Sequence, residues 1–153
     1  MKITITLVLL ITVCTLTGCE PKQTPIPIIG TWELISATTT EGDTTFSTFD
    51  PTRKMIKIIN STHFAFLNHD VSGSSDSSAT FSAGGGSYTL SDSVYTEDLE
   101  YFADKRWENN KFRFTIKLIN DTLTQKGVEK VEKLGIDHVI IEKYKRVSPS
   151  KDA

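Results

Sequence analysis

The sequence predicts an all-β protein, an antiparallel up-and-down β-barrel of about eight to nine strands. Apolar and polar residues alternate strictly from Lys111 to Leu118, as expected for a strand with one buried face and one solvated face. Similar short runs recur along the chain, separated by turn-forming residues that are typical of antiparallel hairpins. A barrel is favoured over a sandwich because closure removes exposed strand edges.

The other expected strands follow in order along the chain. They span residues 30–38, 54–59, 63–67, 79–83, 87–90, 93–101, 122–126 and 137–147. Residues such as Asn60-Ser61 and Asn120-Asp121 supply the turns, and Gly84-Gly85-Gly86 predicts a bulge or a loose hairpin. Only residues 127–135 show apolar residues at helical spacing, so we expect a short helical turn before the last strand.

The first 18 residues are predicted to be an export signal. Lys2 precedes an apolar run from Ile3 to Val13 that is too short to span a bilayer. The segment ends in Leu16-Thr17-Gly18-Cys19, which resembles the lipobox of bacterial lipoproteins, whose cysteine is alkylated by diacylglycerol. We therefore expect Cys19 to be the lipidation site. The alternative is an ordinary secretory peptide that leaves a free Cys19.

Residues 19–28 are expected to form a tether, because they hold three prolines and no apolar periodicity. Residues 29–148 then form one barrel domain, and residues 149–153 a disordered tail. Glu20 is not the aspartate that commonly retains lipoproteins in the inner membrane, which favours the bacterial outer membrane, on its periplasmic or surface side. The formal net charge of −2, without basic clusters, excludes a nucleic-acid partner.

Several segments together resemble the lipocalin, or calycin, family. They are Gly30-Thr31-Trp32 on the first expected strand, the series of hairpins, and Arg146 near the end of the last strand. The stretches GTWELISATTTEGDT, AGGGSYTLSDSVYTEDLEY, DTLTQKGVEK and IIEKYKRV resemble a group of uncharacterised bacterial lipocalin-like lipoproteins. The family's Thr-Asp-Tyr-type motif and long C-terminal helix are missing from the sequence.

The resemblance implies a lipocalin-like barrel with a closed floor. Trp32 would lie across that floor, Arg146 would stack on its indole ring, and Gly30 would permit close approach of the chain. The alternative is that Trp32 contacts a ligand, but ligands of lipocalin-type barrels enter at the opposite end.

Strand parity predicts which side chains face the interior, because residues two apart share a face. If Trp32 faces inward, so do Leu34 and Ser36, whereas His63 faces outward. The other side chains expected inside are Phe64, Phe66, Tyr95, Glu97, Leu99, Tyr101, Phe112, Phe114, Ile116, Leu118, Ile140, Glu142 and Tyr144.

Glu97 and Glu142 are therefore expected inside, where a carboxylate must be paired or bind a ligand. In one interpretation, Glu142 completes the Arg146 contact at the floor and Glu97 lies near the wet mouth. In the other, Glu97 orients a polar ligand with an apolar body, held by tyrosines. Those tyrosines are Tyr95, Tyr101 and Tyr144.

We expect a small amphiphilic or hydrophobic ligand in the barrel mouth, by family resemblance and because a barrel mouth is concave. Trp107, in an expected hairpin loop, is either a lid or a satellite of the core. The candidate ligand-binding residues are Phe66, Tyr95, Glu97, Tyr101, Trp107, Phe112, Glu142 and Tyr144. The alternative function is a cell-envelope interaction module with a filled barrel.

No catalytic residue, metal site or cofactor is expected. His63, His69 and His138 are scattered without the spacing of zinc ligands, and no serine lies in a nucleophile-elbow motif. We therefore expect a non-enzymatic, monomeric protein that binds or carries a small molecule.

Overall fold

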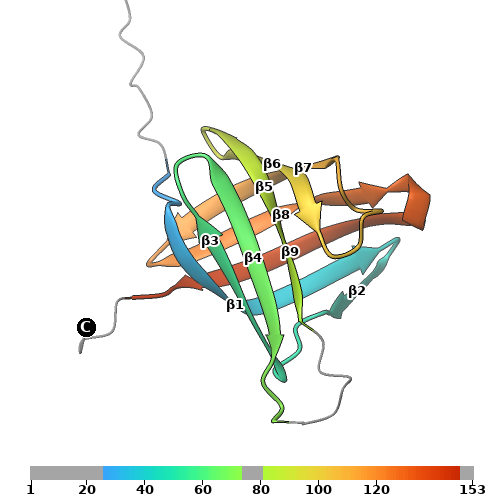
Figure 1. Ribbon diagram of the computed structural model, residues 1–153, viewed down its shortest axis with the longest axis horizontal. Helices are drawn as coiled ribbons and strands as arrows, with labels where there is room; N and C mark the ends of the chain where they lie inside the picture. The colour runs from blue at the N-terminus through green and yellow to red at the C-terminus, as the bar shows by residue number, and fades with distance from the viewer. Residues whose placement is uncertain (1–25, 74–80, 149–153) are drawn as a thin grey trace, which may run out of the picture.

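The computed structural model describes residues 26–73 and 81–148 and shows a closed antiparallel β-barrel (Figure 1). The strands β1 (Gly30–Glu41) and β9 (Ile136–Arg146) pair with each other and close the sheet. Eight strands form the barrel, and β2 (Thr44–Ser47) lies outside it. The all-β prediction is confirmed. The expected signal peptide, Cys19, the tether up to residue 25 and the tail lie outside the described residues.

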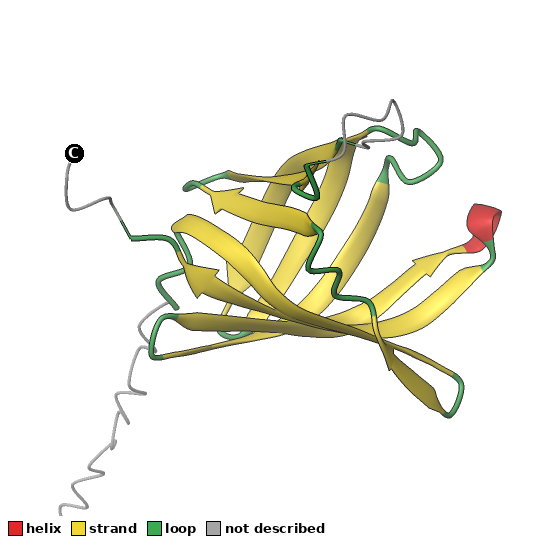
Figure 2. Cartoon of the chain, turned by 90° about the horizontal axis from the view of Figure 1, so that it is seen from below, coloured by secondary structure: helices red, strands yellow, loops and turns green. Residues whose placement is uncertain are grey.

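The remaining elements follow as hairpins, each strand pairing with the next along the chain. They are β3 (Arg53–Ile59), β4 (His63–Asp70), β5 (Ser82–Ser91), β6 (Val94–Phe102), β7 (Asn110–Ile119), β8 (Thr122–Val131) and the 3-10 helix η1 (Glu132–Leu134). The helical turn before β9 is confirmed and is drawn in red in Figure 2. It is shorter than residues 127–135 because β8 continues to Val131.

The three consecutive glycines lie inside one strand and do not join two strands. The expected strands 79–83 and 87–90 are one strand, β5, as far as the described residues show. Its register against β6 shifts between Gly85 and Gly86, so the predicted bulge is present. In addition, β2 was not expected from the sequence.

The bulge overturns the prediction for Tyr101. Gly85 pairs with Tyr101 and Gly86 with Leu99, so Glu100 is the extra residue in β6. An extra residue exchanges the two faces of the strand beyond it. Tyr101 is consequently 64% exposed, and Phe102 packs against the core in its place.

A second register shift overturns the prediction for Ser36. The pairing of β1 with β9 is irregular between Leu34 and Ser36, and Ile35 is left exposed. Beyond this point the buried residues of β1 are Ala37 and Thr39, not Ser36. The prediction holds for Leu34, which packs against the core.

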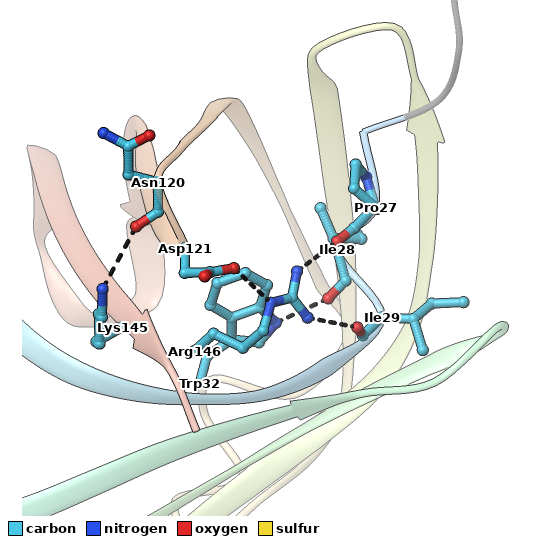
Figure 3. A network of polar contacts seen from close by, with 8 residues as sticks. All are labelled: Pro27, Ile28, Ile29, Trp32, Asn120, Asp121, Lys145 and Arg146. Carbon is cyan, nitrogen blue, oxygen red and sulfur yellow. Dashed lines mark hydrogen bonds and ion pairs between the residues drawn. The ribbon is translucent and has the colours of Figure 1, made fainter. Parts of the chain in front are cut away.

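Trp32 and Arg146 close one end of the barrel. Trp32 is fully buried, and the guanidinium carbon of Arg146 lies 4.1 Å from the centre of its ring (Figure 3). Arg146 donates hydrogen bonds to the carbonyl oxygens of Ile29, at 2.9 Å, and Pro27, at 2.8 Å. The indole Nε1 of Trp32 donates to the carbonyl of Ile28 at 2.7 Å. The last strand therefore holds the N-terminal segment across the barrel floor.

Gly30 allows this close approach. A Cβ atom there would lie 2.7 Å from Nη1 of Arg146, and the backbone φ of +147° is unfavourable for a residue with a side chain. A glycine is therefore required where the chain passes under the guanidinium group.

We predict that Arg146→Met lowers the free energy of unfolding by about 2 kcal/mol, because the cation–π contact and two hydrogen bonds are lost. Lys145→Met is the matched control, since this exposed neighbour makes only a 3.3 Å bond to the carbonyl of Asn120. It should change stability by less than about 0.5 kcal/mol. Urea unfolding measures both variants, and equal losses would contradict a floor held by Arg146.

Candidate functional site

A buried polar layer lies above the barrel floor. Lys57 of β3, Glu97 of β6 and Gln125 of β8 are 3%, 7% and 1% exposed. The Lys57 ammonium group donates to Glu97 Oε1 at 2.8 Å and to Gln125 Oε1 at 3.1 Å. A buried ion pair requires such additional hydrogen bonds, because both charges have lost their water. Sequence reasoning placed Glu97 inside but missed Lys57 and Gln125.

Aromatic rings surround the Lys57 ammonium group. Its nitrogen lies 5.7 Å from the centre of the Phe64 ring, 6.0 Å from that of Tyr95 and 5.2 Å from that of Tyr144. The negative faces of aromatic rings attract a cation at such distances. Inside the barrel, the ammonium group of Lys57 is therefore in contact with one carboxylate, one amide oxygen and three rings.

Glu142 forms the other half of the layer. The Tyr144 hydroxyl donates to Glu142 Oε2 at 2.6 Å, and Gln125 Nε2 donates to the same oxygen at 3.5 Å. Burial raises the pKa of Glu142, and the positive charge of Lys57 opposes that rise. The interpretation that Glu142 completes the Arg146 contact, with Glu97 at a wet mouth, is wrong. Both carboxylates belong to a buried layer with their own partners.

A cavity of about 170 Å³ lies next to this layer, toward the end of the barrel opposite the Trp32 floor. It is lined by Phe66, Glu97, Leu99, Phe102, Trp107, Phe112 and Glu129. Neighbouring ring centres are 5.6 Å apart for Phe66 and Phe102, and 5.9 Å apart for Phe102 and Trp107. The cavity therefore has an aromatic wall and two carboxylates in its lining.

Gly84 makes room for this wall. A Cβ atom at Gly84 would lie 2.5 Å from the Phe66 ring and 2.7 Å from the Phe102 ring. The two rings can meet across β5 only because this inward position carries no side chain.

Glu129 is the second carboxylate of the cavity. Its carboxylate accepts a hydrogen bond from His138 Nε2, at 3.0 Å, when that nitrogen carries the proton, and His138 Nδ1 lies 3.6 Å from Glu41. Burial raises the pKa of Glu129 against the opposing effect of the His138 bond. Sequence reasoning missed Glu129, because it assigned residues 127–135 to a helical turn. The pairing of β8 with β9 through Val131 shows that the strand continues, and no alternation of apolar residues in the sequence marks it.

The predicted ligand-binding residues fall into three groups. Phe66, Glu97, Trp107 and Phe112 line the cavity, and Trp107 packs 6.1 Å from Phe112 as part of its wall. The remaining candidates do not line the cavity. Tyr95, Glu142 and Tyr144 belong to the polar layer or pack next to it, and Tyr101 lies on the outer surface.

Tyr95 carries an unsatisfied polar group. Its hydroxyl is buried and has no hydrogen-bond partner among the described residues. Burial, together with the nearby charge of Glu97, raises the pKa of Tyr95. Tyr95 therefore stays neutral and offers a donor close to the Glu97 carboxylate.

A larger but shallower groove, of about 430 Å³, lies over β4, β5 and β6. Ala65, Leu67, Ala83 and Tyr101 contribute to its lining on the outer face of the sheet. Unlike the barrel cavity, it is a shallow groove that is open to solvent. The barrel cavity is therefore the stronger candidate site.

Neither models of known protein families nor curated proteins gave a match to this chain. Within residues 26–73 and 81–148, no three His, Cys, Asp or Glu side chains are grouped to hold a metal ion. The same residues contain no helix long and apolar enough to cross a membrane. The function must therefore be argued from the geometry of the site.

We predict that Lys57→Met lowers the free energy of unfolding by about 3–5 kcal/mol, because Glu97 is left buried without a counter-charge. Combining it with Glu97→Gln should restore part of the loss, since the unpaired charge is then removed. Lys54→Met is the control on the same strand, where an exposed pair with Glu33 contributes at most about 1 kcal/mol. Comparable losses for Lys57→Met and Lys54→Met would refute the buried pair.

We predict that the contribution of Glu142 to stability depends on pH. Because the pKa of Glu142 is raised in the folded protein, the folded state binds more protons than the unfolded state between the ordinary value and the raised value. The stability of the unmodified protein relative to Glu142→Gln should therefore increase as the pH falls from neutral to mildly acidic.

Glu100→Gln supplies the opposite sign as a control. The pKa of Glu100 is lowered by its bonds to Ser87, so its stabilising effect is lost as the pH falls. Thermal unfolding at both pH values measures the two differences. A Glu142 difference that stays constant or shrinks on acidification would be inconsistent with a buried, desolvated carboxylate.

Proposed function

We propose that this protein is a lipocalin-like binding protein, anchored in the cell envelope, that holds a small amphiphilic or hydrophobic ligand in its barrel. The observation that carries the proposal is the cavity between the buried polar layer and the mouth, walled by aromatic rings and flanked by Glu97 and Glu129. Most small-molecule sites combine such an apolar wall with a few placed polar groups.

The cavity volume limits the size of the ligand. Drug-sized ligands occupy pockets of roughly 300–1,000 Å³, whereas a cavity of about 150 Å³ holds one benzene molecule. At about 170 Å³, this cavity suits a single ring or a short aliphatic body.

The place where the N-terminal segment reaches the barrel supports a defined orientation of the barrel relative to the membrane. Arg146 binds the carbonyl groups of Pro27 and Ile29, so the N-terminal segment reaches the barrel at its floor (Figure 3). If Cys19 carries the lipid that its lipobox-like motif implies, the floor faces the membrane and the mouth faces away. This arrangement suits a monomeric lipoprotein of the bacterial outer membrane that exchanges its ligand with the surrounding solution.

The alternative, an envelope interaction module, has one observation in its favour. The groove over β4 to β6 is larger than the cavity and is bordered by the exposed Tyr101. A partner protein bound there would leave the barrel interior unoccupied. The binding experiment below separates the two functions.

We predict that neutral one-ring probes, toluene and benzyl alcohol, change the tryptophan fluorescence of the full-length protein in lipid nanodiscs, because Trp107 lines the cavity. Leu99→Phe should abolish this binding, because the added ring fills the cavity that Leu99 lines. Leu67→Phe is the matched control, since Leu67 lies on the outer groove and not on the cavity. Binding lost in Leu67→Phe but retained in Leu99→Phe would favour the alternative.

A further inference from the structure

The charged residues of the cavity wall are all negative. The two charged residues that line the cavity, Glu97 and Glu129, are both acidic. The nearby cation, Lys57, does not line it, because its ammonium group is directed to Glu97 Oε1 and Gln125 Oε1 in the polar layer. A ligand in the cavity therefore meets carboxylates and rings.

Carboxylates outnumber lysines in this part of the barrel. Glu97, Glu129 and Glu142 come together from β6, β8 and β9, and Lys57, which is paired with Glu97, also attracts Glu142. His138 adds a second positive charge only when it is protonated. Burial raises the pKa of both Glu129 and Glu142, and the neighbouring carboxylates add to that rise.

The aromatic wall favours the same kind of ligand. Phe66, Phe102, Trp107 and Phe112 pack in a continuous series with ring centres 5.6 to 6.1 Å apart. Ring faces attract organic cations, and they also bury an apolar body. A carboxylate or phosphate on the ligand would instead be placed against Glu97 and Glu129.

We infer that the ligand is a small organic amine, whose ammonium group lies between Glu97 and Glu129 and whose apolar body lies against the aromatic wall. The inference rests on the proposed binding function and names its ligand class. Glu129 is the residue that selects the amine, because Glu97 is held by the permanent charge of Lys57, whereas the partner of Glu129, His138, is charged only when it is protonated.

Three probes of matched shape and different charge test the inference. They are phenethylamine, phenethyl alcohol and phenylpropionate, each titrated calorimetrically into the full-length protein in nanodiscs, with empty nanodiscs as the blank. We expect phenethylamine to bind about ten-fold more tightly than the alcohol, and phenylpropionate to bind most weakly. This ranking needs no mutation, so it does not depend on the folding of a variant.

Two variants then assign the selectivity to a residue. Glu129→Gln should weaken phenethylamine binding by about ten-fold and leave phenethyl alcohol binding unchanged, because only the charge is removed. Glu132→Gln, on the exposed 3-10 helix at the mouth, should leave both affinities unchanged.

The experiments distinguish a failure of the amine inference from a failure of the proposed binding function. Equal affinities for the three probes, or tightest binding of phenylpropionate, would overturn the amine inference while leaving the binding function in place. Equal effects of Glu129→Gln on the amine and the alcohol would also overturn it. If none of the three probes binds, the proposed binding function fails and the inference fails with it.

Discussion

The ion pair between Lys57 and Glu97 determines how the interior of this barrel is divided. On the floor side, Trp32, Ile59 and Leu123 fill the space with apolar side chains. At the level of the pair, two charges at 2.8 Å and an amide from a third strand span the interior. Beyond it the packing opens into the cavity. Apolar residues in place of Lys57 and Glu97 could fill the barrel at this level. The ion pair therefore lies between the packed floor and the cavity.

Such a layer costs free energy, because burial removes the hydration of both ions. The cost is offset here by the amide of Gln125 and by the rings of Phe64, Tyr95 and Tyr144 around the ammonium group. These partners come from strands distant in sequence, so the layer forms only when the barrel closes. The contact of Arg146 with Trp32 joins β9 to β1 at the floor and so fixes that closure.

The sequence was most informative where its period was regular. The alternation from Lys111 to Leu118 correctly placed Phe112, Phe114 and Ile116 inside, because no bulge interrupts the strand. The prediction failed at Tyr101 and Ser36, since one extra residue exchanges the faces of a strand without changing its composition. A bulge position is set by the partner strand, which a local pattern does not contain.

The candidate site was harder to predict for a related reason. Lys57 shares a face with Ile59, but a lysine in a strand suggests solvent until its carboxylate partner, forty residues along the chain, is known. Glu129 lies in a segment whose valines, Val128 and Val131, are three residues apart, a spacing that fits a helix and not one face of a strand. Phe112 was found because its strand has one clearly apolar face, and Glu97 because its face of the strand carries the aromatic residues. Function-bearing polar residues inside a barrel become visible only through contacts between strands.

We propose that the cavity above the Lys57–Glu97 pair is the ligand site, and a crystal structure of the protein with phenethylamine would test this. We expect the ring to lie against Phe66, Phe102 and Trp107, with the nitrogen within hydrogen-bond distance of Glu129. A ligand found instead on the outer groove beside Tyr101, with the barrel cavity unchanged, would contradict it.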